Sequence, residues 1–270
     1  MAQQKCSIVI PVVPKHFRYL KKLLNELNLE DRFVGEIHIC ASSVNETNLL
    51  RLMQIAAQSS FDRKIKIHSC PDMKTAGENR NYGWNKAIFD IVVFLDADDL
   101  YHPNRLEFVT SVIINNHADA LVHDYYRMVP KYFFKFGNFD GYSLILADQL
   151  YKVNRVKLEN SLPDGSLYAG ESNLLLPVDG FKKLKVHHGH LTVRRDIPLR
   201  YTNRKLGEDG ELVHELLKHR YNMVYVSTKL SIYDRLNYSN LALTMKGHAL
   251  VQSSKIFRLF LPKKDRRISE

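Results

Sequence analysis

The sequence predicts an α/β fold in which a mostly parallel central sheet carries helices on both faces. Two observations support this prediction. Apolar segments rich in β-branched residues alternate, over residues 6–116, with segments whose apolar residues recur every three or four positions. Strands and helices that alternate in this way form parallel sheets with helices on both sides. The 270-residue chain is long enough to build a substantial core.

The expected elements of the first half follow from these patterns. The run CSIVIPVV (6–13) is apolar throughout, which is typical of a strand buried on both faces. The segment FRYLKKLLNEL (17–27) places Phe17, Leu20 and Leu24 on one side of a helix. The other expected elements are strands at 36–42, 64–70 and 91–99, and helices at 45–58, in the second half of 77–90, and at 103–116.

The pattern becomes less regular after residue 117. Residues 129–170 are rich in aromatic residues, Gly and Asp and indicate hairpins or loops. A strand is expected at 119–128, a helix at 211–219 and a closing strand at 221–227. No composition shift in this half indicates a linker to a second domain.

The composition is that of a soluble globular protein. The sequence has no apolar stretch near the roughly 20 residues of a membrane-spanning helix, and its N-terminus lacks the features of a signal peptide. Cys6, Cys40 and Cys70 form no C-x-x-C pair and are expected to be free thiols in a reducing compartment. We therefore expect a cytoplasmic protein.

The net charge of +10 and the pI of about 9.4 indicate an anionic partner, or simply a soluble surface. The basic residues are scattered and form no nucleic-acid-binding motif, so nucleic acid is the least favoured partner. The basic and apolar segment KIFRLFLPKKDRR (255–267) has two interpretations: it lies on an anionic membrane surface, at the cytoplasmic face, or it is a solvated tail.

A cluster of acids follows the fourth expected strand. In FLDADDLYHP (94–103), Asp96, Asp98 and Asp99 come directly after an apolar run. Helix capping explains one Asp in such a position but not three. Ligands bind beyond the carboxyl ends of strands in these sheets, and Mg²⁺ and Mn²⁺ bind carboxylate oxygens and share phosphate groups with them. The cluster therefore predicts a metal site that binds a phosphorylated ligand.

The sequence around this cluster resembles family 2 glycosyltransferases of the GT-A fold. The segment KTAGENRNYGWNKAIFDIVVFLDADDLYHPNRL (74–106) has the family's G-x-x-x-R-N-x-G segment, apolar strand and D-x-D motif. The opening strand and helix, GEDGELVHELLKH (207–219) and YDRLNYSN (233–240) are similar to its other motifs. The resemblance implies a Rossmann-like GT-A domain over 1–240, with a nucleotide-binding half (1–120) and an acceptor half (121–240), followed by a basic tail (241–270).

The resemblance also implies an activity. A sugar would pass with inversion from a nucleotide-sugar donor, by family default a UDP-sugar, to a hydroxyl of a glycan or lipid-linked acceptor. Asp209 would be the general base. Asp96, Asp98 and Asn237 would hold Mn²⁺ or Mg²⁺, with Asp98 the firmest ligand and Asp99 a helper or cap. The donor would also contact Pro11, Val13, Ser42, Arg80 and Ala97.

The chain departs from the family pattern at two positions. No carboxylate follows the second strand until Glu46, so Ser42 or Ser43 would have to hydrogen-bond the nucleotide base. Asn237 stands where many relatives have a His that helps to hold the metal. A protein of the same fold that binds nucleotide sugars without catalysis is therefore the alternative. On the residues alone, Glu208 and Asp209 could also simply complement a helix dipole.

Three further features have competing interpretations. The segment HHGH (187–190) matches no zinc motif and is either an edge of the active site or a polar turn. Trp84 is expected in the core rather than in sugar binding. Tyr125 and Tyr126 either line an acceptor cleft or pack structurally.

Overall fold

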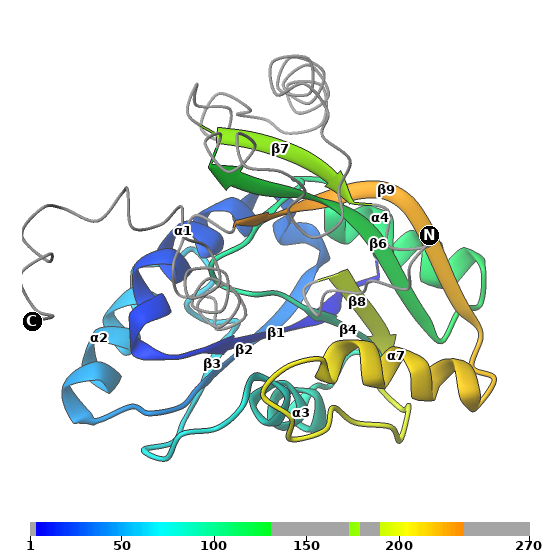
Figure 1. The fold of residues 1–270 in the computed structure, drawn as a ribbon. Helices are drawn as coiled ribbons and strands as arrows, with labels where there is room; N and C mark the ends of the chain where they lie inside the picture. The colour runs from blue at the N-terminus through cyan, green and yellow to red at the C-terminus, as the bar shows by residue number, and fades with distance from the viewer. Residues whose placement is uncertain (1–3, 131–172, 179–189, 235–270) are drawn as a thin grey trace, which may run out of the picture. The chain divides into compact units, whose positions relative to one another are not determined.

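The computed structural model describes residues 4–130, 173–178 and 190–234 (Figure 1). The chain divides into a compact unit, Met1–Asp234, and a second unit, Arg235–Glu270, which lies outside the described residues. The predicted basic tail and most of the predicted hairpin and loop region, 131–170, therefore stay predictions.

One mixed sheet is the framework of the first unit. Its first half contains four parallel strands in the spatial order β3–β2–β1–β4: β1 (Cys6–Val12), β2 (Val34–Ala41), β3 (Ile65–Ser69) and β4 (Ile91–Phe94). The sheet continues through β8 (Leu191–Arg194), β6 (Ala120–Pro130), β9 (Met223–Asp234) and β5 (Leu100–Tyr101), and β7 (Asn173–Val178) pairs with β6. The antiparallel pairs are confined to this second half, so the predicted α/β fold is confirmed.

Helices cover both faces of the sheet, as predicted. Alternate residues of β1 point to opposite faces: Ile8 packs with Leu24 in one cluster, and Val9 packs with Trp84 and Leu216 in another. The first cluster contains residues of α1 (Phe17–Leu27), α2 (Glu46–Ala57) and α4 (Arg105–Asn115). The second contains residues of α3 (Ala76–Lys86) and α7 (Glu208–Lys218), which lie close together in Figure 1. Short helices η1 (Pro14–His16) and η2 (Asn28–Phe33) flank α1.

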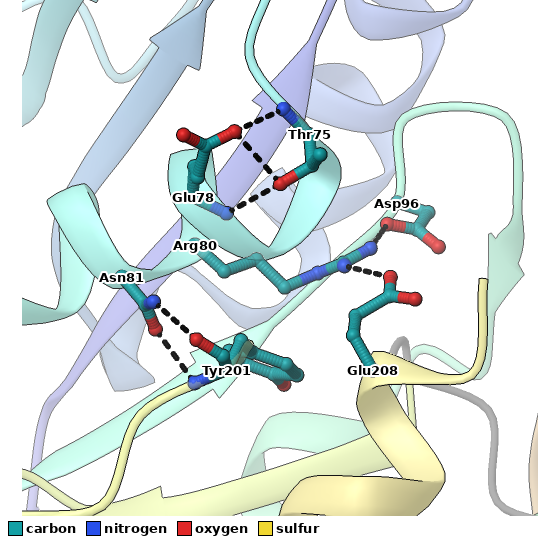
Figure 2. Close-up of polar contacts among 7 residues, drawn as sticks. All are labelled: Thr75, Glu78, Arg80, Asn81, Asp96, Tyr201 and Glu208. Atoms are coloured by element: carbon teal, nitrogen blue, oxygen red, sulfur yellow. Dashed lines mark hydrogen bonds and ion pairs between the residues drawn. The ribbon is translucent and has the colours of Figure 1, made fainter. Parts of the chain in front are cut away.

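Helix α3 begins at a capping box. The Thr75 hydroxyl accepts a hydrogen bond from the Glu78 N–H at 3.2 Å, and the Glu78 carboxylate accepts one from the Thr75 N–H at 2.7 Å (Figure 2). The prediction of a helix in the second half of 77–90 was therefore wrong in its bounds. The helix begins at Ala76, because this cap satisfies its first N–H groups, and it ends at Lys86.

Other boundaries differ from the prediction as well. The closing strand expected at 221–227 runs from Met223 to Asp234, because it pairs with β6 along its length. The strand expected at 91–99 ends at Phe94, because a turn closed by the Asp99 N–H and the Asp96 carbonyl at 3.3 Å follows it. The helix expected at 211–219 begins at Glu208, after Gly207, whose φ of 82° is accessible mainly to glycine. Asp209 consequently lies within the first turn of the helix rather than before it.

The parallel strands end at a common edge of the sheet. Val9 of β1 is paired with Phe94 of β4, so the residues that follow these strands emerge next to each other. Ser42 follows β2 at the same edge. This is the edge where ligands bind in open α/β sheets.

Single-residue expectations agree with this packing. Trp84 is buried in the core, as predicted, and its indole N–H donates to the Arg195 carbonyl at 3.0 Å. Cys6, Cys40 and Cys70 are free thiols. In the part of the chain that the structure describes, no helix is both long and apolar enough to span a membrane.

Candidate active site

The acid turn, Asp96–Asp99, is at the centre of the site. Two of its acids are buried, with exposed fractions of 9% for Asp96 and 2% for Asp99, whereas Asp98 is half-buried at the tip of the turn. The Tyr101 hydroxyl accepts from the Asp96 N–H at 2.7 Å and donates to the Asp96 carbonyl at 3.2 Å. These bonds fix the backbone of the turn, which leaves the Asp98 carboxylate the most accessible of the three.

A buried arginine supports the turn from the side of α4. The Arg105 guanidinium donates to His123 Nε2 at 2.8 Å and lies over the Tyr101 ring, 4.9 Å from its centroid. Because His123 Nε2 accepts this bond, its Nδ1–H donates to the Asp124 carbonyl at 2.8 Å. Burial, together with the charge of Arg105, lowers the pKa of His123 well below its usual value, so the imidazole is neutral.

A second buried arginine joins the acid turn to α7. The Arg80 guanidinium donates to Asp96 Oδ1 at 2.6 Å and to Glu208 Oε1 at 3.3 Å, as Figure 2 shows. Its side chain is only 1% exposed. Burial disfavours the charged guanidinium, but the charges of Asp96 and Glu208 outweigh this effect and raise the pKa of Arg80. Arg80 therefore neutralises part of the crowded acid charge.

The segment before α7 is attached to α3 through Asn81. The Tyr201 N–H donates to Asn81 Oδ1 at 2.9 Å, and Asn81 Nδ2 donates to the Tyr201 carbonyl at 2.8 Å. Burial raises the pKa of the Tyr201 phenol well above its usual value. The same phenol experiences the charges of the groups around it, which are Arg80, Asp209, Asp96 and Glu208. The Tyr201 phenol is thus close enough to both Asp96 and Asp209 to sense their charges.

A histidine from the end of β1 also approaches the acids. His16, in η1, is half-buried, and its Nε2 atom is buried with no hydrogen-bond partner among the described residues. Burial lowers the pKa of His16, and the charges of Asp98 and Asp96 oppose this effect. The imidazole is thus close enough to Asp98 to sense its charge.

The other predicted donor contacts are distributed along the same edge. Pro11 is buried in β1, Val13 is half-buried just before η1, and Ala97 is buried within the acid turn. The Ser42 side chain is buried, accepts from Asn79 Nδ2 at 3.0 Å and donates to the Lys74 carbonyl at 3.5 Å, so it ties the end of β2 to α3. Asn237 lies outside the described residues.

The predicted HHGH segment is described only at its last residue. His190 is buried, and its ring lies 4.1 Å from the ring of Tyr125 and 5.0 Å from that of His123. Residues 187–189 lie outside the described residues. The buried position of His190 supports a packing role for this side chain and for Tyr125.

The described residues provide an incomplete set of metal ligands. No group of three His, Cys, Asp or Glu side chains in the described ranges is arranged to hold a metal ion. Mg²⁺ and similar ions, however, are commonly bound through one or two carboxylates together with substrate phosphates and water. The half-buried carboxylate of Asp98, in the same turn as Asp96, fits this partial role.

Three residues of the site were not assigned a role from the sequence. Glu208 was considered only as part of the motif at 207–219 and as a complement to a helix dipole, and neither Tyr201 nor His16 was assigned a function. His16 could have been found, because it follows the first strand at the edge where the acid turn was expected. The contacts of Glu208 and Tyr201 with α3 could not have been found, because the partners are far apart in the sequence. Arg80 and Glu208 are 128 positions apart, and Asn81 and Tyr201 are 120 positions apart.

Solved structures show which fold the chain shares. S. aureus TarS 1–349 in complex with UDP matches with a TM-score of 0.56 and 17% identity, over 86% of this chain and 60% of that chain. Glucosyl-3-phosphoglycerate synthase from Mycobacterium tuberculosis in complex with Mn²⁺, UDP and glucosyl-3-phosphoglycerate matches with a TM-score of 0.54 and 14% identity, over 91% and 76% of the two chains. The fold is that of GT-A glycosyltransferases.

The sequence then identifies the family. Residues 7–183 match Glycosyl transferase family 2, and the chain belongs to this family of glycosyltransferases. The sequence has no significant match among curated proteins. The chain spans 60% of the S. aureus TarS fragment that it resembles.

Proposed function

We propose that the protein transfers a sugar, with inversion, from a UDP-sugar to a hydroxyl acceptor in a reaction that requires Mn²⁺ or Mg²⁺. The observation that carries this proposal is the bridge from Asp96 through Arg80 to Glu208. It brings the first turn of α7, with Asp209, to the acid turn at the carboxyl edge of the sheet. This bridge supports a site in which the acid turn binds the diphosphate and Asp209, the neighbour of Glu208, acts as the base.

The nucleotide follows from the similar structures. S. aureus TarS has been crystallised with UDP and with UDP-GlcNAc, and the mycobacterial synthase with Mn²⁺ and UDP. The same fold in this chain supports UDP as the nucleotide of the donor. Pro11, Val13, Ser42 and Ala97 lie at the edge where the donor would bind, with Ser42 buried behind it.

The metal would be held mainly by Asp98, with Asp96 beside it and Asn237 as a further predicted ligand. When bound, the ion would neutralise the diphosphate and make it a better leaving group. His16, close to Asp98, would lie beside the phosphates.

Asp209 is the proposed general base. Asp209 lies in the first turn of α7, which is an amphipathic helix. At this end of the helix the dipole favours a negatively charged carboxylate. In the reaction, the acceptor oxygen bonds to the anomeric carbon of the sugar as the bond from that carbon to the diphosphate oxygen breaks. Asp209 takes the proton of the acceptor hydroxyl, and UDP leaves with the electron pair.

The acceptor class is proposed on the resemblance alone. A glycan or a lipid-linked glycan offers the required hydroxyl. A lipid-linked acceptor would agree with contact between the basic tail and an anionic membrane, at the cytoplasmic face.

Donor binding and turnover test the proposal together. We expect UDP to raise the melting temperature only with Mn²⁺ or Mg²⁺ present, and a screen of UDP-sugars to identify a donor that is transferred or hydrolysed. Asp98→Ala should lose the metal-dependent shift. Asp209→Asn should keep UDP binding and lose about 100-fold or more in kcat.

The control for the second variant is Asp90→Asn, the same chemical change at an exposed position that pairs with Arg195 at 4.0 Å. It should behave like the wild type. Metal-independent UDP binding would refute the role of the acid turn, and full activity of Asp209→Asn would refute the base. Binding of UDP without turnover of any donor would favour the non-catalytic alternative.

A further inference from the structure

We propose that α3 positions α7, the helix that carries Asp209, against the acid turn. In this proposal Arg80 joins the two by bonding both Asp96 and Glu208, and it does not contact the nucleotide. This inference rests on the proposed function. It assigns to the G-x-x-x-R-N-x-G segment the role of positioning Asp209, and not that of binding the donor.

The first argument is the position of Arg80. Its guanidinium is almost fully buried and already bonded to carboxylates from two different elements, Asp96 after β4 and Glu208 of α7. Figure 2 shows it lying between them. Because the Arg80 side chain is only 1% exposed, a nucleotide could reach the guanidinium only if the residues around it moved, and a carboxylate left buried without its partner is costly.

The second argument is Asn81, the next residue of α3. Its amide bonds both the N–H and the carbonyl of Tyr201, at 2.9 and 2.8 Å. These two bonds fix the backbone of the segment leading to α7 in position and direction. Tyr201 precedes Glu208 by only seven residues. The start of α7 is therefore attached to α3 at two points, the Asn81 bonds to Tyr201 and the Arg80 ion pair with Glu208.

The third argument is the close approach at Gly77, one turn earlier on α3. A Cβ atom at this position would lie 2.6 Å from the Thr202 carbonyl oxygen and 3.4 Å from the Glu208 Cγ. Only glycine allows the two segments to approach so closely. Gly77, Arg80 and Asn81 therefore contact the same stretch, 201–208.

The opposite side of α3 is fixed to the sheet. A Cβ atom at Gly83 would lie 2.5 Å from Val9 Cγ1 in β1 and 2.9 Å from Cys40 Sγ in β2. The helix is thus in close contact with the central strands on one side and with the segment before α7 on the other. The position of Asp209 relative to Asp96 is set by this arrangement.

The chemistry of the link requires arginine. A guanidinium offers several N–H donors in a planar fork and can bond two separate carboxylates, whereas a lysine ammonium is a single point charge on a flexible chain. In Arg80→Lys, one of the two ion pairs would be lost or loosened. A displacement of about 1 Å in a catalytic group can cost on the order of 100-fold in rate.

The test compares Arg80→Lys and Glu208→Ala with the wild type in kcat, donor KM and the Kd of UDP with Mn²⁺. We expect both variants to lose roughly tenfold to 100-fold in kcat, with the Kd of UDP changed by less than about threefold. The double variant should lose little more than either single one, because both break the same link.

Arg200→Lys is the matched control. Arg200 attaches the same segment to α3, donating to Asn85 Oδ1 at 2.8 Å and to the Leu199 carbonyl at 2.8 Å. Neither Asp96 nor Glu208 is among its partners in the described part of the chain. Its kcat should stay near that of the wild type. If Arg80→Lys fails to fold, Glu208→Gln keeps an acceptor oxygen for Arg80 and should show a smaller loss of kcat than Glu208→Ala, at unchanged UDP affinity.

Three outcomes overturn the inference. One is a UDP affinity that falls at least tenfold in Arg80→Lys with kcat retained, which would make Arg80 a nucleotide contact. Another is unchanged kcat in both variants, and the last is an equal loss in Arg200→Lys. A wild type that turns over no donor would instead refute the proposed function.

Discussion

At the scale of single residues, Asp96 and Asp98 show how neighbouring residues of one type take different roles. Asp96 is buried and bonded to Arg80, whereas Asp98 is half-buried at the tip of the turn. The sequence favoured Asp98 over Asp99 as a metal ligand, and Asp98 is the more exposed of the two. It could not predict the partner of Asp96, because Arg80 lies on a different element.

Glu30 is a buried carboxyl group whose protonation should make stability depend on pH. It is 5% exposed and accepts a hydrogen bond from the Glu107 N–H at 3.1 Å. Burial raises its pKa from 4.5 to about 8, although this hydrogen bond and the charge of Arg105 oppose the rise. Between these two pH values the folded protein holds a proton that the unfolded chain has lost, so the free energy of unfolding falls as the pH rises.

We expect Glu30→Gln to remove this dependence. The variant should gain stability relative to the wild type between about pH 5 and about pH 8, by up to a few kcal/mol. Urea unfolding at both pH values measures the difference. Parallel pH profiles for the two proteins would contradict the prediction.

At the scale of elements, α3 carries most of the contacts that bring the site together. Gly77 of α3 and Gly210 of α7 have different surroundings. Gly77 is in close contact with Thr202, whereas a Cβ atom at Gly210 of α7 would meet nothing within 4 Å.

Alanine substitutions at these two glycines should have opposite effects. Gly77→Ala forces the 201–208 segment away and should destabilise the protein by about 1–3 kcal/mol. Gly210→Ala should be neutral or stabilising by up to about 1 kcal/mol, because alanine favours the helix. Urea unfolding measures both values, and a Gly77→Ala variant as stable as Gly210→Ala would show that α3 and the 201–208 segment are not in close contact.

The sequence predicted the existence of most elements better than their ends. Apolar periodicity identified α1 and α2 closely, because each is a surface helix with one buried side. The strand at 91–99 was predicted too long because an apolar run alone does not show where a turn begins. The start of α3 was missed because the capping box, Thr75 and Glu78, was not recognised.

At the scale of the whole molecule, the parallel half of the sheet was predictable and the mixed half was not. Strands β1 to β4 alternate with helices along the chain, so their arrangement follows from local sequence. In the second half, β6 pairs with β9, as in Ala120 with Met223. Local patterns do not determine pairings between segments so far apart.

A crystal structure of the protein with UDP and Mn²⁺ would test the proposed donor site and the position of Arg80 most directly. We expect the diphosphate and the metal at Asp98, with the ion pairs from Arg80 to Asp96 and Glu208 intact and Asp209 facing the donor site. Nucleotide bound away from the acid turn, or Arg80 released from Glu208 to contact UDP, would contradict it.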